Sequence, residues 1–246
     1  MYILAIETTG PYASAAIVSE TGKIYGAECS HNSLSHMKEI IPMTEKLLER
    51  IEISKEQLSL VAVSAGPGSF TGIRIGVSTA RGLCQALQIK GLAVPTLEAF
   101  IRKKKSSDER VACAVINARR GQVYGIIENY LEAGPYMMTE VLDVIERNVI
   151  PDGKKIIFYG DGIDAYQNII EERLGLVGER YDLSAEESRY QDAIAVGITA
   201  AETIKAQGLD CLLDYNDILP DYMRKAEAEQ KLAAGELPIC KGPRQE

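Results

Sequence analysis

Three short apolar segments separated by tight turns open the sequence and limit the folds that it can adopt. They cover residues 2–8, 13–19 and 23–29. The turns between them are too short for a parallel crossover connection, which needs about a dozen residues or more. We therefore expect an antiparallel meander of three strands at the start of the chain.

A helix, a buried strand and a glycine-rich stretch follow this meander. Apolar residues at three- and four-residue spacing predict a helix over 37–51, in which Pro42 starts or kinks the regular part. The almost uniformly apolar run 58–64 is typical of a strand that is buried on both faces. The glycine-rich stretch 65–76 leaves this strand and opens a second helix, which we expect to end near Gln88.

The second half of the chain repeats this order of elements. We expect three strands joined by short turns, then a short helix, a strand and two longer helices, over 111–118, 122–130, 136–141, 142–147, 155–160, 163–174 and 192–206. A segment at 95–103, with Thr96 as its N-cap, bridges the halves. The sequence thus predicts an α/β protein with two βββαβα units in tandem.

Composition limits the partners and the compartment of the chain. It has 246 residues and a formal net charge of −8, which disfavours a broad nucleic-acid surface on this chain alone. RNA contact is therefore expected through a partner. No apolar run approaches the ~20 residues of a membrane span, and the N-terminus lacks a basic leader, so we expect a cytoplasmic protein. Five widely spaced cysteines without a CxxC pair indicate neither a disulfide framework nor a zinc site.

Two tandem βββαβα units are the plan of the actin, Hsp70 and sugar-kinase superfamily, whose domains have an RNase H-like core. Four stretches sharpen the resemblance, and they cover residues 35–42, 66–76, 117–124 and 219–225. In order and spacing these stretches are similar to the motifs of the glycoprotease-like family, in its TsaB (YeaZ-type) branch. The resemblance implies an actin-like domain over 1–97, completed by a C-terminal segment, a smaller one over 98–225, and a tail over 226–246.

The resemblance also implies a role in making N6-threonylcarbamoyladenosine in tRNAs that decode ANN codons. Members of this branch pair with TsaD, the subunit that binds metal and transfers the threonylcarbamoyl group, and the ATPase TsaE joins the pair. The chain would then be a non-catalytic partner and activator that meets tRNA indirectly. It would need no cofactor of its own, while the complex would use ATP and Mg²⁺. Self-pairing as a homodimer stays open.

An ATP-dependent enzyme of the actin-like superfamily is the alternative function. Its candidate anion site comprises Glu7, Thr8, Gly66, Gly68, Ser69, Thr71, Gly72 and Arg74. Glycines at 66 and 68 permit positive φ, and the hydroxyl at 69 or 71 can cap the helix that follows. The loop lacks the Lys-Ser/Thr ending of a P-loop, and relatives usually have aspartate in place of Glu7. We therefore favour a structural role for Glu7 at the hairpin end.

The helix after the glycine loop carries a line of small residues beside its apolar face. Together with the preceding helix, this line forms a candidate partner face that comprises Met37, Ile40, Ile41, Ile75, Ser78, Thr79, Gly82 and Ala86. A helical glycine costs about 1 kcal/mol relative to alanine, so Gly82 indicates the close approach of another helix. That neighbour is either the chain's own helix 37–51 or a partner, and the resemblance implies such a face for TsaD and for self-pairing.

The two histidines favour no metal site or catalytic set. His31 and His36 are five residues apart, which places their side chains on different faces of a helix. His36 lies in one of the family-like stretches without implying catalysis.

Two further stretches contain the remaining motif residues. Asn117 replaces the family's usual aspartate and predicts an Asx turn, with Gly121 at positive φ. Arg119 meets either phosphate or solvent, and we favour solvent. Tyr222 and Arg224 either tie the tail to the body of the protein or contact a partner or RNA.

Overall fold

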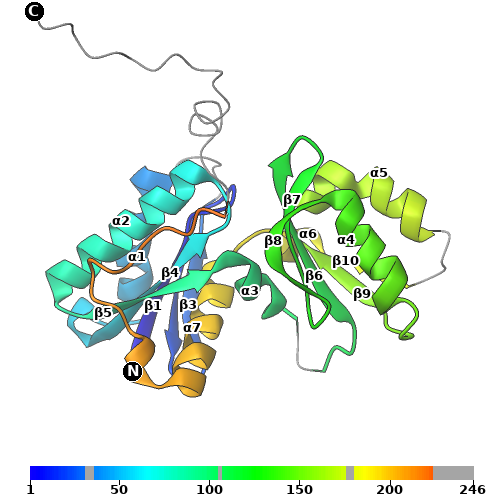
Figure 1. Ribbon diagram of the computed structural model, residues 1–246. Coiled ribbons are helices and arrows are strands. Elements are labelled where there is room, and N and C mark those ends of the chain that lie inside the picture. Colours follow the sequence, from blue (N-terminus) through cyan, green and yellow to red (C-terminus); the bar gives the residue numbers. More distant parts are fainter. Residues whose placement is uncertain (31–35, 105–106, 176–179, 224–246) are drawn as a thin grey trace, which may run out of the picture.

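The protein consists of two lobes, each built on its own five-stranded sheet (Figure 1). This computed structural model describes residues 1–30, 36–104, 107–175 and 180–223. The strand order is β3-β2-β1-β4-β5 in the first sheet and, from the corresponding edge, β8-β7-β6-β9-β10 in the second. Each strand therefore has a counterpart in the other lobe, which is the tandem actin-like arrangement.

The first sheet contains β1 (Tyr2–Glu7), β2 (Ser14–Ser19), β3 (Ile24–Cys29), β4 (Leu58–Gly66) and β5 (Lys90–Pro95). The predicted meander is confirmed, because β1, β2 and β3 pair antiparallel. The strands β1, β4 and β5 run parallel. Sequence analysis missed β5, since Gly91 and Pro95 resemble loop punctuation and only the pairing with β4 makes this segment a strand.

The second sheet contains β6 (Val111–Arg119), β7 (Gln122–Ile127), β8 (Leu131–Met137), β9 (Ile156–Tyr159) and β10 (Tyr181–Leu183). The predicted strand 136–141 is wrong, because β8 ends at Met137 and a helix follows. Gly134 and Pro135 resemble a turn, yet they lie inside β8, which is an edge strand and therefore tolerates proline. The short strand β10 was also missed.

The described residues also form seven α-helices and three further short helical segments. They are α1 (His36–Arg50), η1 (Lys55–Gln57), α2 (Phe70–Leu87), α3 (Thr96–Ile101), α4 (Met138–Val144), η2 (Ile145–Val149), α5 (Gly162–Leu174), α6 (Glu186–Arg189), α7 (Ala193–Gln207) and η4 (Leu209–Cys211). Helix α1 begins before Pro42 and continues past it, so the proline does not start the helix. Thr96 is not the N-cap of α3. Pro95 has that position, and the Thr96 hydroxyl bonds the Ser64 hydroxyl at 2.6 Å.

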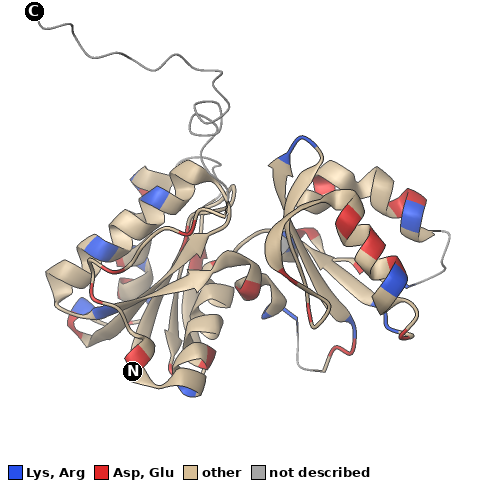
Figure 2. Cartoon of the chain, viewed as in Figure 1, with Lys and Arg blue, Asp and Glu red and all other residues tan. Residues whose placement is uncertain are grey.

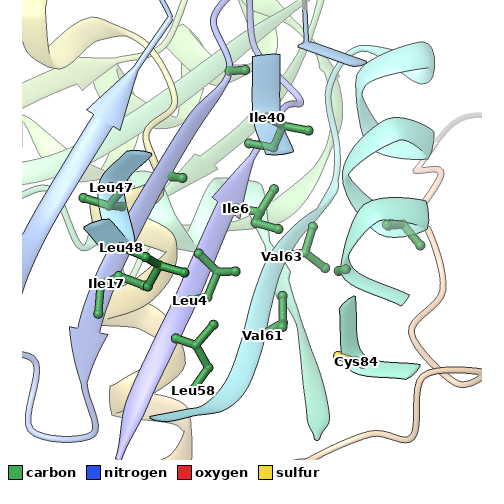
Figure 3. Packing of buried hydrophobic residues seen from close by; sticks show 14 of the residues in the cluster. Leu4, Ile6, Ile17, Ile40, Leu47, Leu48, Leu58, Val61, Val63 and Cys84 are labelled. Atoms are coloured by element: carbon green, nitrogen blue, oxygen red, sulfur yellow. The ribbon is translucent and has the colours of Figure 1, made fainter. Parts of the chain in front are cut away.

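Side chains alternate between the two faces of the first sheet, and helices cover both faces. Leu4 and Ile6 share a buried cluster with α1 and α2, whereas Ile3 and Ala5 share one with α7. All four side chains are fully buried. Figure 3 shows the first of these clusters, with helix residues such as Leu47 facing the strands. Burial on both faces explains why the strands are almost uniformly apolar.

The end of the described chain belongs to the first lobe. Helix α7 packs on the first sheet, and the C-terminal strap (208–223) then crosses the edge of that sheet beside β5. Two backbone hydrogen bonds of 2.8 and 2.9 Å join Leu213 of the strap to Gly91. The second domain was predicted to cover 98–225, which extends it too far, because composition alone cannot assign α7 to one sheet or the other.

We predict that Ile218→Ala destabilises the first lobe by about 3 kcal/mol, because the Ile218 side chain is fully buried and its removal leaves a cavity. Leu219→Ala is a matched control, since Leu219 is 60% exposed and its loss should cost about 0.5 kcal/mol or less. Urea unfolding of the two variants measures the difference. Equal stability of the two variants would show that the strap is not part of the folded lobe.

Candidate functional site

Four strands end at a cleft between the lobes. Strands β1 and β4 contribute from the first lobe, and β6 and β9 contribute from the second. The cleft has a volume of about 640 Å³, and residues at or just beyond the ends of these strands line it, including Thr9, Ser69, Asn117 and Asp161. Ligands of α/β proteins commonly bind beyond the carboxyl ends of parallel strands, so this cleft is the first place to test for a site.

The glycine loop (66–72) lies on the first-lobe side of the cleft, but its own chain fills the space beside its glycines. A side chain at Gly66 would meet the Asp221 carbonyl of the strap, and one at Gly72 would meet the Thr8 carbonyl. A side chain at Gly68 would lie 2.7 Å from Thr9. Gly66 also has a φ of +126°, which few other residues adopt. These glycines therefore accommodate the protein's own backbone.

The polar groups at the start of α2 are also engaged within the chain. Ser69 is the N-cap, as predicted, and its hydroxyl accepts from the Gly72 amide at 3.3 Å. The Ser69 amide donates to the Thr9 carbonyl at 2.8 Å, and the Thr8 hydroxyl donates to the Gly72 carbonyl at 2.7 Å. Thr71 is exposed and does not cap the helix. The turn after β1 is thus docked onto the first turn of α2.

Glu7 is buried behind this turn and is 1% exposed. Its carboxylate accepts a hydrogen bond from the Thr9 amide. Burial raises the pKa of Glu7, an effect partly opposed by hydrogen bonds from Thr9 and Ser64. A carboxylate that organises Mg²⁺ must reach the ion or its water shell. Glu7 and the occupied glycine loop therefore do not fit a magnesium nucleotide.

On the second-lobe side, Asn117 and Asp161 hold the turn after β6. The backbone amide of Asn117 donates to the Asp161 carboxylate at 2.9 Å. The side-chain oxygen of Asn117 accepts from the backbone amide of Arg119 at 2.8 Å. The predicted Asx turn and the positive φ of Gly121 are both confirmed. Burial is the main cause of the raised pKa of Asp161. Sequence analysis missed Asp161, although it follows a predicted strand between two glycines.

Arg119 lies at the tip of the hairpin between β6 and β7, at the rim of the cleft. Its side chain is exposed, and Figure 2 shows basic residues at this tip. No ion pair involves Arg119 in the part of the chain that the structure describes. This exposure agrees with the preference for solvation over a buried phosphate contact.

Gln191 separates the cleft from a second groove on the other side of the lobe junction. The residue is 6% exposed, lines both spaces, and lies against Gly10, where an added side chain would meet its amide oxygen. No local pattern marks this position, because Gln191 reaches the first lobe from a distant part of the chain. The side chain closes the base of the cleft between the lobes.

Among the described residues, neither His36 nor the motif residue Tyr222 lines this cleft. His36 is buried, and burial lowers its pKa. Within the described ranges, histidine, cysteine, aspartate and glutamate form no group of three that could bind a metal ion. His31 and Arg224 lie outside the described residues. Tyr222 contacts the start of α2, where Arg74 donates to its hydroxyl at 2.9 Å.

The predicted partner face lies on α1 and α2, away from the cleft. Met37 is 73% exposed and Ile41 is 38% exposed. Along α2 the predicted positions are exposed or half-buried, and these are Ile75, Ser78, Thr79, Gly82 and Ala86. Ile40 is wrong as a face residue, because it is 1% exposed and belongs to the core. The helical spacing put it beside Ile41, but its side chain points to the sheet.

Gly82 decides between the two explanations offered for this face. Apart from its chain neighbours and the backbone of α2 itself, no atom of the described residues lies within 4 Å of the position that a side chain at Gly82 would occupy. The explanation by close packing against the chain's own α1 is therefore wrong. Two exposed apolar side chains of α1, Met37 and Ile41, lie on the neighbouring helix. The face is smooth and partly apolar, and none of the described residues covers it at Gly82.

None of the helices described here is both long enough and apolar enough to cross a membrane.

Comparison with known proteins identifies the family. A family model described as TsaD, tRNA N6-adenosine threonylcarbamoyltransferase, matches residues 17–232. A Bacillus subtilis (strain 168) protein named tRNA threonylcarbamoyladenosine biosynthesis protein TsaB is 27% identical over 94% of this chain and 97% of its own length. The TsaB of Buchnera aphidicola subsp. Schizaphis graminum is 34% identical over 65% of this chain and 78% of its own length. The chain belongs to the TsaB branch of this family.

Solved structures support the fold of this TsaB-family chain. A Pseudomonas aeruginosa protein described as similar to the peptidase YeaZ superposes with a TM-score of 0.70 at 22% identity. The comparison covers 91% of this chain and 99% of that protein. A structure named YeaZ, also from Pseudomonas aeruginosa, gives a TM-score of 0.66 at 24% identity. The two-lobed architecture is thus shared with YeaZ proteins.

We predict that Glu7→Gln removes a loss of stability that the wild-type protein suffers as pH rises. The raised pKa of Glu7 means that the folded state binds more protons than the unfolded state, where the carboxyl titrates near 4.5. The contribution of Glu7 to the free energy of unfolding is therefore greatest below pH 4.5, and it declines as pH rises toward the pKa of the folded state. Urea unfolding between pH 4.5 and 8 measures the wild-type minus variant difference.

The exposed Glu45→Gln serves as the control for this titration. The expected result is a pH-dependent difference for Glu7→Gln that exceeds the difference for Glu45→Gln, which alters only the surface. A flat difference for both variants would contradict the burial of an ionisable Glu7.

Proposed function

We propose that this chain takes part in the formation of threonylcarbamoyladenosine in tRNA, as a partner and activator of TsaD without catalytic activity of its own. The proposal is supported by family membership and by the names of the TsaB relatives. The reaction concerns tRNAs that decode ANN codons. We propose a cytoplasmic location because tRNA modification of this kind requires access to tRNA.

The uncovered face on α1 and α2 carries this proposal. Gly82 costs about 1 kcal/mol of helix stability relative to alanine, and no contact inside the chain makes use of the missing side chain. A partner helix that crosses closely over Gly82 and Ser78 would use the space left by the missing side chain. Met37 and Ile41 would then be its apolar anchors. We assign this face to TsaD, and a homodimer through the same face is the competing state when TsaD is absent.

The chemistry is then assigned to the partners. TsaD carries the transfer step, the ATPase TsaE joins the pair, and ATP with Mg²⁺ acts in the complex. The net charge of −8 supports an indirect rather than a broad direct contact of this chain with tRNA. The alternative of an independent ATP-dependent enzyme has no support from the geometry, since Glu7 is buried and the glycine loop is occupied.

We predict that Gly82→Leu weakens binding to TsaD from the same organism by at least about 100-fold while the isolated chain stays folded. The open space around Gly82 lets the chain accept leucine, but the added side chain would hold a partner helix away. Gly82→Ala is the matched control and should retain most of the binding. Calorimetric titration measures affinity, and circular dichroism checks the fold.

ATP hydrolysis by the isolated chain separates the two candidate functions. The expected result is no turnover by this chain alone and activity only after TsaD and TsaE are added. Turnover by the isolated chain that is lost in Glu7→Ala would establish the ATP-dependent enzyme instead. If Gly82→Leu binds TsaD as tightly as the wild-type chain, the interface with TsaD does not include this face.

A further inference from the structure

Arg74, at the start of α2, is held in a fixed orientation by the aromatic rings of Phe70 and of the strap residue Tyr222. Its guanidinium carbon lies 4.0 Å from the centroid of the Phe70 ring and 5.8 Å from that of the Tyr222 ring. The two rings are themselves stacked, with centroids 4.6 Å apart and an interplanar angle of 29°. The Arg74 Nε–H group donates to the Tyr222 hydroxyl at 2.9 Å. A residue of the strap therefore sets the plane of this guanidinium.

This arrangement engages only one edge of the guanidinium. The Nε–H group is bonded to the Tyr222 hydroxyl, and the side chain is exposed. No described carboxylate forms an ion pair with Arg74. The first turn of α2 contains no acidic residue either. A cation near a helix N-terminus is unfavourable with respect to the helix dipole, so Arg74 is a cost to the isolated chain.

Arg74 lies at the margin of the face on α1 and α2. It directly precedes Ile75 and is one helical turn before Ser78, so its side chain borders the line that ends at Gly82. Tyr222 is 37% exposed on the other side of it. The cation and its aromatic support thus adjoin the surface that we assign to TsaD.

We propose that Arg74 is a specificity-determining residue that binds a carboxylate of the protein partner docked on this face, and that Tyr222 is its positioning residue. This inference rests on the proposed function. With Nε bonded to tyrosine, the two Nη groups present the end-on edge that binds a carboxylate through two parallel hydrogen bonds. The rings fix this edge before the partner arrives, so little side-chain freedom is lost on binding.

A protein carboxylate fits the surroundings better than an RNA phosphate. The neighbouring line on α2 consists of small and apolar residues, among them Ile75, Ser78 and Gly82, which suit a helix of a protein partner. A phosphate backbone needs several cations along its path, and the chain has an excess of eight negative charges. The acidic group would meet the guanidinium at the edge of an otherwise apolar contact, where it selects the partner and its orientation.

The test compares the affinity of the full chain for TsaD at two salt concentrations. Arg74→Gln should weaken binding about tenfold at low salt and remove most of the salt dependence, since an ion pair is lost. Arg74→Lys should not restore wild-type affinity, because an ammonium group cannot make the two parallel bonds. Tyr222→Phe keeps every charge but frees the guanidinium, so it should raise the dissociation rate about threefold.

Arg147→Gln is the matched control, because Arg147 is 78% exposed on the second lobe and its loss changes the net charge equally. Thermal unfolding of each variant checks that the strap stays in place. A purely structural role of Arg74 would shift affinity equally at both salt concentrations, and that outcome overturns the inference.

Two further outcomes separate this inference from the proposed function. Failure of the wild-type chain to bind TsaD would refute the proposed function. Binding of TsaD by Arg74→Gln at the level of Arg147→Gln would refute the role of Arg74 alone. If Arg74→Gln leaves TsaD binding unchanged but weakens the retention of tRNA by the complex, the guanidinium binds RNA. That result would also overturn the proposed contact with a partner carboxylate.

Discussion

The contact between the turn after β1 and the first turn of α2 organises the first lobe. The carbonyl of Thr8 lies over Gly72, and the Thr8 hydroxyl donates to the Gly72 carbonyl. The same hydroxyl lies against Gly76, one helical turn later. Only residues without a side chain allow this approach. Because the contact presses one side of α2 onto the sheet, the opposite line of small residues faces outward. The orientation of the partner face thus depends on a packing contact deep in the lobe.

The same contact gives the glycines of the loop at 66–72 a structural role. Glycines after a strand allow close approach of a ligand or of the protein's own backbone, and the two uses look alike in one dimension. Here Thr8 and the strap residue Asp221 occupy that space. The strap adds a second closure at Ile218, which packs against Gly91. Chemistry is thereby displaced from the loop, and the outer face of α2 is left for recognition.

The sequence predicted much of the fold and part of the candidate site. Alternation and helical spacing gave the meander, the buried strand β4, helix α2 with its Ser69 cap, and the Asx turn at Asn117. The errors concern elements whose state depends on neighbours: β5 becomes a strand through β4, and β8 tolerates Pro135 because it lies at an edge. Ile40 shared the helical spacing of the face but turned into the core.

The sequence by itself determined the two-fold recurrence of strands and helices and the family to which the chain belongs. Local periodicity and turn chemistry encode the recurrence, since they depend on residues that are close together along the chain. The four motif stretches carry the resemblance to the family. The resemblance implied that a C-terminal segment completes the first lobe, but only the tertiary structure decided that α7 and the strap form this segment, that Gln191 meets Gly10, and that the described residues leave Gly82 uncovered. These features depend on contacts between residues far apart in sequence, which no local pattern records.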